Sequence, residues 1–278
     1  MADDVTPASK AEIKRALMDA KDELPELGGL KGFTSGEWLL TLVRKAFRNY
    51  WSKANAEYFR NKYPAKDDEF IVKRLTKVAA RNAGLLGAGT GAVVSTDELV
   101  AIFTGAGGGF GLPANIAIAA TAIAAEGVAL VRIHLQLIAN IAKLVGAPLD
   151  PEDPEDILTI LAFALGGAAA EGVGKFGAKV GGRMAGAATK RVLSGETLKA
   201  LKALALKLHF RILQRSVVKY AVPIASMGVG AAWNYAATRA VGKIAYRNCL
   251  GRLRDMGPVP NPSSGGPVPA SISGQSAQ

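Results

Sequence analysis

The sequence predicts an all-α fold: a single helical domain with a long central helix and Gly/Ala-rich, close-packed helical hairpins. Three observations favour this class. Apolar residues make up 49% of the 278 residues but aromatic residues only 6%, so small and aliphatic side chains carry the apolarity. The 32 glycines suit helices that approach one another closely. No segment shows the strict alternation of apolar and polar residues that is typical of a half-buried strand.

The central helix is predicted over residues 114–144. Pro113 stands at a first helical position, and Gly146 follows just past the end. At ~1.5 Å per residue this helix spans roughly 46 Å. Its first half is apolar on almost every face, whereas its second half carries a polar stripe, which indicates a buried half and a half that meets water. The stripe consists of Arg132, Gln136, Asn140 and Lys143.

Three amphipathic helices are predicted before the central one, over residues 9–24, 37–63 and about 67–86. The second carries an apolar and aromatic stripe at helical spacing, with basic residues on its other side. This stripe favours a core-facing helix, and a membrane-surface or partner helix is the alternative. Its members are Trp38, Leu39, Leu42, Val43, Phe47, Tyr50 and Trp51.

Further helices are predicted after the central one. Asp153 precedes Pro154 in an acidic stretch typical of a capped helix start. A basic helix is expected over about residues 196–219, and the last helix ends near Leu253. We divide the chain into an N-terminal helical extension (1–35), an all-helical domain (36–255) and a disordered Pro/Ser/Gly-rich tail (256–278).

The positive charge is concentrated in the C-terminal third. The net charge is +11, and residues 171–255 carry 16 basic and 3 acidic side chains. Within this region Lys175, Lys179 and Arg183 recur every four residues, so a helix would present all three on one side. We take them, with Lys190 and Arg191, as candidate residues for binding anions or lipid headgroups.

No motif predicts a reaction, and we expect no catalytic residue, no cofactor and no metal. The GxGxxG pattern at residues 172–177 lacks the preceding strand that a dinucleotide site needs, so close helix packing explains it better. His134 and His209 have no cysteine or carboxylate at ligand spacing. Cys249 is the only cysteine, which excludes an intrachain disulfide. The polar N-terminus is unlike a secretory signal, so we expect a cytoplasmic location.

Glu126 is the candidate buried polar residue, because it interrupts the apolar half of the central helix. A buried carboxylate needs a partner or a proton. We expect it to pair with a basic side chain of the C-terminal third or to reach water, and a ligand or proton role is the alternative. The apolar runs are each short, broken or charged when compared with the ~20 residues of a spanning helix. They favour a buried core or a hairpin in one leaflet over a full span.

Residues 71–253 resemble the EcsC family of helical proteins. The resemblance rests on the order of four segments: VAARNAGLLGAGTG, GGGFGLPANIAIAATAIAAEGVALVRIHLQLIANIAKLVG, LDPEDPEDILTILAFALG and VPIASMGVGAAWNYAATRAVGKIA. It implies an all-helical fold with apolar hairpins, membrane association and no established catalytic activity. Glu126 and the many alanines of the central helix depart from the bulkier apolar residues expected there.

Together these features predict a non-enzymatic protein that associates peripherally with the cytoplasmic face of a membrane. The basic C-terminal third would bind anionic lipid, and an accessory role beside a membrane complex or transporter is compatible with this docking. The Gly-rich helices would allow oligomerisation. One alternative is a soluble helical protein with a lipid-like apolar ligand in its core. A nucleic-acid-binding protein ranks third, because aromatic residues for base stacking are sparse in the basic region.

Overall fold

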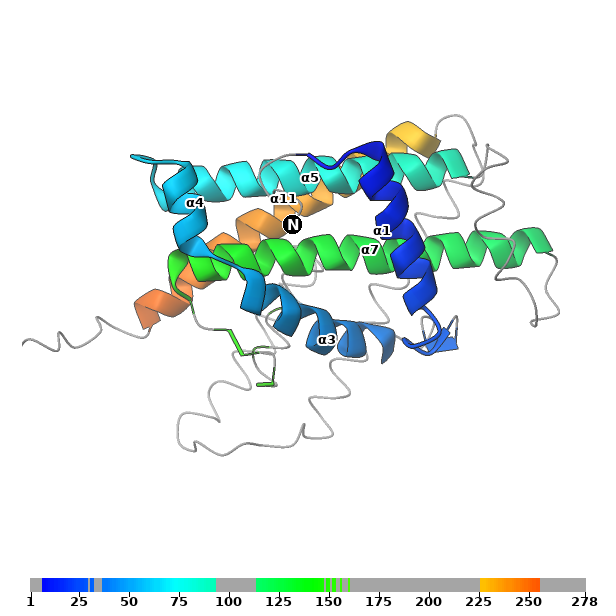
Figure 1. Cartoon of the computed structure of the whole chain (residues 1–278), viewed down its shortest axis with the longest axis horizontal. Helices are drawn as coiled ribbons and strands as arrows, with labels where there is room; N and C mark the ends of the chain where they lie inside the picture. The colour runs from blue at the N-terminus through cyan, green and yellow to red at the C-terminus, as the bar shows by residue number, and fades with distance from the viewer. Residues whose placement is uncertain are drawn as a thin grey trace, which may run out of the picture.

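The computed structural model describes residues 7–29, 31–32, 37–93, 114–147, 149–150, 152–153, 156, 160 and 226–255. This part of the chain contains six helices and no strand, which confirms the all-α prediction (Figure 1). The helices are α1 (Lys10–Glu23), α3 (Glu37–Lys53), α4 (Ala56–Lys62), α5 (Asp68–Val93), α7 (Ala114–Val145) and α11 (Ser226–Asp255).

Helix α7 is the central element, and its bounds agree with the prediction to within one residue. Gly146 ends it in the left-handed region, at φ 76°. The Gly146 N–H donates to the Lys143 carbonyl at 3.2 Å and the Ala147 N–H donates to the Ala142 carbonyl at 2.8 Å. These two bonds form a Schellman motif, which is why glycine is required just past the helix end. Helices α1, α3, α4, α5 and α11 all pack against α7.

The helices form a layered bundle around α7. Helix α5 lies alongside α7, α1 crosses both of them, and α3 packs on α7 away from α5 (Figure 1). Helix α11 packs against both α5 and α7. Arg60 of α4 joins the ends of two helices, because it bonds Asp68 of α5 at 2.9 Å and the Leu144 carbonyl of α7 at 2.6 Å. The end of α7 therefore lies beside the start of α5, and these two helices are antiparallel.

The prediction of one continuous helix over residues 37–63 is wrong. Helix α3 ends at Lys53 and α4 begins at Ala56. Asn55 stands between them with extended backbone, and its side chain accepts a hydrogen bond from the Tyr58 N–H at 3.0 Å. Asparagine competes for backbone donors in this way and starts a new helix rather than continuing the old one. The stripe from Trp38 to Phe47 is buried as predicted.

Helix α5 is longer than predicted, because it continues past Leu86 to Val93 through the sequence GAGTGAV. Glycines usually weaken a helix by ~1 kcal/mol each relative to alanine. Here Gly87 lies against α11 and Gly89 against Ile13 and Leu17 of α1, and tertiary packing outweighs this weak local propensity. The same reason explains α11, which begins at Ser226 inside a Gly/Ala-rich apolar run.

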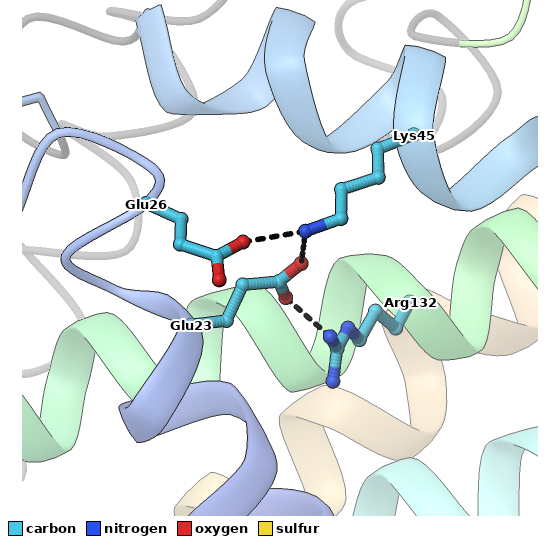
Figure 2. Close-up of polar contacts among 4 residues, drawn as sticks. All are labelled: Glu23, Glu26, Lys45 and Arg132. Carbon is cyan, nitrogen blue, oxygen red and sulfur yellow. Dashed lines mark hydrogen bonds and ion pairs between the residues drawn. The ribbon is translucent and has the colours of Figure 1, made fainter.

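Helix α1, from the segment expected to be an N-terminal extension, shares the core of the bundle. Ile13 and Leu17 belong to the same buried cluster as the side chains of α3, α5 and α7. Its start is fixed by a capping box between Ser9 and Glu12. Its other end is fixed by Glu23, which bonds Arg132 of α7 and lies 3.6 Å from Lys45 of α3 (Figure 2).

One described segment, Thr121–Val145 of α7, is long and apolar enough to cross a membrane by length and composition alone. However, 72% of its apolar window is buried inside the fold, as in the core helix of a soluble protein. The predicted basic helix at 196–219, the Gly-rich segment at 167–188 and the tail at 256–278 lie outside the described residues.

Candidate membrane-binding surface

Helices α5 and α11 pack antiparallel at very short range. A Cβ placed on Gly87 would lie 2.6 Å from the Gly230 carbonyl oxygen, and one placed on Gly242 would overlap the side chain of Thr76. Gly87 of α5 thus lies opposite the start of α11, and Thr76 lies opposite its middle. This register brings the residues around Lys77 next to those around Lys243.

Each of these two helices carries a row of exposed basic side chains at four-residue spacing. Each row has three residues, and we call the six residues together the basic face. On α5 the row begins one turn after the acidic start of the helix, and on α11 it occupies the middle. Because the two helices are in contact and antiparallel, the rows run side by side. The basic face consists of Lys73, Lys77, Arg81, Arg239, Lys243 and Arg247.

The basic face has almost no acidic compensation. Between residues 70 and 93 of α5, and between 226 and 254 of α11, the sequence contains no carboxylate. Within the described part of the chain, only Lys73 of the six forms a salt bridge, to Glu69 at 2.7 Å. Hydrogen bonding to Glu69 raises the pKa of Lys73 above its ordinary value. The other five charges are not neutralised by neighbouring described side chains.

Tyr246 of α11 lies near the carboxylates at the start of α5, where the basic face ends. Burial, and after it the carboxylates of Glu69, Asp67 and Asp68, raise the pKa of the Tyr246 hydroxyl. The tyrosine of α11 therefore lies beside the first turn of α5, as the antiparallel register requires. The positive potential thus begins at Lys73 and extends away from this end.

The basic face lies on the side of the α5–α11 pair that is turned away from α7. On α5, the residues beside α7 include Leu75, Ala79 and Asn82, none of which belongs to the basic row. On α11, the residues bonded to α7 side chains are Asn234 and Thr238. The six basic residues project from other sides of both helices and are exposed.

Buried polar contacts join α7 and α11 beneath this surface. The Asn234 side-chain amide donates to Glu126 Oε1 at 2.9 Å. One turn later, Thr238 Oγ1 donates to the Asn234 carbonyl at 2.8 Å and lies 3.0 Å from His134 Nε2. Since the hydroxyl has only one proton, Nε2 must be the donor in the His134–Thr238 bond. These contacts fix the rotation of α11 against α7, and so determine which residues face outward.

Glu126 is therefore held at a helix interface, and it is half-buried. One of its partners is the Asn234 amide of the C-terminal third, and pairing with a basic side chain of that third stays a prediction. The Asn234 contact gives the carboxylate a structural role in joining α7 to α11. It supplies no evidence for the alternative role in binding a ligand or carrying a proton.

The candidate residues Lys175, Lys179, Arg183, Lys190 and Arg191 lie outside the described residues. The structure reveals a second basic surface that the charge distribution obscured, because half of it belongs to a region of nearly balanced charge. In the net charge of that region, the acidic residues of the first helices offset Lys73, Lys77 and Arg81. The four-residue spacing on α5 was the available signal, but only the packing of α5 on α11 joins the two rows.

A small cleft lies between α5 and α7. It has a volume of about 50 Å³, and its polar lining comes from Asn82, Gln136 and Asn140. This space suits a few water molecules and is too small for a lipid chain. The cleft therefore offers no support for the alternative of a lipid-like ligand.

The comparisons with known proteins place the chain in no family: no family model, curated protein or solved structure matches it.

Proposed function

We propose that this chain is a non-enzymatic peripheral membrane protein that docks on an anionic leaflet through the basic face of α5 and α11. The observation that carries the proposal is the pairing of two basic rows on one exposed side of two helices, with five of the six charges unneutralised by described residues. The predicted row Lys175, Lys179 and Arg183 is a second candidate for binding anionic lipid. The cytoplasmic leaflet is the anionic one, which suggests that side of the membrane.

The charge on this surface is sufficient for measurable binding. Near an anionic leaflet each basic side chain contributes ~1 kcal/mol, and ~1.4 kcal/mol corresponds to a tenfold change in affinity. The three basic residues of α11 alone would therefore contribute roughly a hundredfold. The resemblance to the EcsC family also implies membrane association. An accessory role beside a membrane complex or transporter is compatible with docking of this kind.

The proposal is tested by replacing Arg239, Lys243 and Arg247 together with glutamine. Binding of the full chain to phosphatidylserine-containing vesicles and to neutral phosphatidylcholine vesicles is measured by cosedimentation. We expect the triple variant to bind the anionic vesicles roughly a hundredfold more weakly and with a flatter dependence on salt. The weak binding to neutral vesicles should not change.

The matched control removes the same charge elsewhere on the surface. Lys10 and Arg15 of α1 and Arg44 of α3 are exposed and form no described salt bridge, and both helices pack on α7. Replacing these three with glutamine should weaken vesicle binding much less. Equal losses in the two triple variants would mean that only net charge matters, and the assignment to the α5–α11 surface would be wrong.

Other results would overturn the proposal itself. If the parent protein ignores anionic vesicles at low salt but binds single-stranded or duplex nucleic acid, the basic face serves the third-ranked function. A further variant, with Lys175, Lys179 and Arg183 replaced by glutamine, tests the predicted row separately. Loss of binding in that variant alone would transfer the docking site from the basic face to that row.

A further inference from the structure

Helix α4, the turn after it and the start of α5 carry a group of aromatic and lysine side chains that we call the aromatic corner: Tyr58, Lys62, Tyr63, Lys66 and Phe70. Tyr63 and Phe70 pack edge to face, with 5.9 Å between ring centroids. The Lys66 ammonium lies 5.3 Å from the centre of the Phe70 ring, and the Lys62 ammonium lies 5.5 Å from that of Tyr58. Lys62 also donates a hydrogen bond to the Tyr58 hydroxyl at 3.2 Å.

The two outer rings are accessible to solvent, as is Trp233 of α11. Tyr58 is 44% exposed and Phe70 is 42% exposed, whereas Trp38, Phe47 and Phe59 are almost completely buried. Aromatic rings with a polar or charged end prefer the headgroup region of a membrane, where one side is apolar and the other is wet. Lysine is compatible with the same depth, because its stem can lie along apolar surface while its ammonium stays in water.

The corner adjoins the basic face at the start of α5. Phe70 precedes Lys77 by seven residues and Arg81 by eleven, and these spacings place all three on the same side of a helix. The carboxylates around the corner are each offset by a basic side chain: Glu57 and Asp67 by Lys62 and Lys66 in number, Asp68 by its salt bridge to Arg60, and Glu69 by its salt bridge to Lys73. Charge attraction would thus come from the basic face, and the corner would add apolar contact.

We propose that the aromatic corner enters the headgroup region of the bilayer and so sets the orientation of the docked protein. This inference rests on the proposed function and deepens it, because it states which part of the fold is deepest in the membrane. The occupant is a lipid interface, since the corner adjoins the face that anionic lipid would attract. The α5–α11 pair would then lie on the leaflet with the start of α5 inserted.

A single-cysteine label tests the depth directly. Cys249 is fully buried, so an environment-sensitive fluorophore can be attached to a new cysteine at Asn61→Cys, an exposed position on α4. With phosphatidylserine-containing vesicles, we expect its emission to shift to the blue and to be quenched by lipids that carry a shallow quencher. The same fluorophore at Met18→Cys, 42% exposed on α1, should remain in a water-like environment.

The outcomes separate this inference from the proposed function. If the labelled proteins do not sediment with anionic vesicles, the proposed function fails. If they sediment but the fluorophore at position 61 stays water-like, the protein docks without inserting the corner, and this inference alone is overturned.

A second pair of variants measures the contribution of one ring. Phe70→Ala should lower the affinity for anionic vesicles by about tenfold without changing the salt dependence, because it removes apolar contact and no charge. Met18→Ala, which removes an equally exposed side chain from another helix, should leave the affinity unchanged. Equal affinities of the parent and Phe70→Ala would also overturn the inference.

Discussion

Gly87 of α5 and Gly230 of α11 meet backbone to backbone. A methyl group at Gly87 would lie 2.6 Å from the Gly230 carbonyl oxygen and 2.6 Å from the side-chain nitrogen of Asn234. Asn234 in turn holds Glu126 of α7. The absence of a side chain at one position thus permits the close approach of two helices and also leaves room for the amide that joins them to a third.

Gly87→Ala should therefore destabilise the fold. The added methyl group would meet backbone atoms, which cannot rotate away, so α11 must shift. Overpacking of this kind costs about 1–3 kcal/mol, and it outweighs the ~1 kcal/mol that alanine gains over glycine in a helix. The free energy of unfolding from urea titration, followed by circular dichroism, measures the loss.

Gly251→Ala is the matched control. Gly251 is also helical, but a methyl group there would have no neighbour within 4 Å. Helix propensity then acts alone, and stability should rise by up to ~1 kcal/mol. If both substitutions change stability in the same direction, the approach of α5 and α11 is looser than the structure indicates.

The sequence was sufficient to predict the elements with strong local signals. The ends of α7 follow from Pro113 and Gly146, and the start of α1 follows from Ser9, because proline, glycine and capping serine act on the adjacent backbone. The buried stripe of α3 follows from helical spacing. The end of α5 beyond Leu86 was not assigned to a helix because its glycines depend on distant partners: Gly87 packs on α11, more than 130 residues away in the chain, and Gly89 packs on α1.

The candidate surface was predictable only in part. The row on α11 is visible from its spacing, and so is the row on α5. Their juxtaposition depends on Gly87, Gly242 and Thr76, which set the register of two helices that are distant in sequence. Helical periodicity states which side of each helix is polar, but not which neighbour it adjoins.

Glu23 and Arg132 provide a second stability test (Figure 2). The Glu23 side chain is only 9% exposed and that of Arg132 is 27% exposed, so screening by water is incomplete. Glu23→Gln should lower the free energy of unfolding by about 1–2 kcal/mol, between the values for exposed and buried pairs. Arg132→Gln should have a similar effect, and the double variant should lose less than the sum of the two.

Glu26→Gln is the control for this cluster. Glu26 bonds Lys45 at 2.6 Å, but both side chains are more than half exposed. Water and salt screen such a pair, so the melting temperature should not change measurably. Additive losses in the Glu23 and Arg132 cycle would show that the two side chains are not energetically coupled.

Replacing Ala65 with glycine should make the folded protein more stable. It lies in the turn between α4 and α5 at φ 60°, a left-handed conformation that costs a residue with a Cβ about 1–2 kcal/mol. Ala65→Gly removes that cost and loses part of the gain through the greater freedom of the unfolded chain. We expect a net stabilisation of up to ~1 kcal/mol in urea titrations. Ala11→Gly, at an exposed helical position of α1, should instead destabilise by ~1 kcal/mol.

Because of Cys249, we expect the free energy of unfolding to fall in alkali. Burial, opposed by Arg252 and reinforced by Asp156, raises the pKa of its thiol from 9.0 to about 12. The folded protein therefore disfavours the thiolate, which the unfolded chain forms freely above pH 9. The stabilisation is fully present below pH 9 and is lost as the pH rises toward 12. A shift of this size corresponds to an upper limit of ~4 kcal/mol, since one pKa unit is ~1.4 kcal/mol.

Cys249→Ala isolates this effect from the lysines and tyrosines that titrate in the same range. Below pH 9 the variant should be less stable than the parent, because a buried sulfur has been removed. Between pH 9 and 12 the parent alone bears the cost of keeping its thiol protonated. The difference in unfolding free energy between the two proteins should thus shrink and can reverse. Parallel curves across this range would mean that the thiol ionises in the folded protein as easily as in the unfolded chain, and that α11 does not seal it from water.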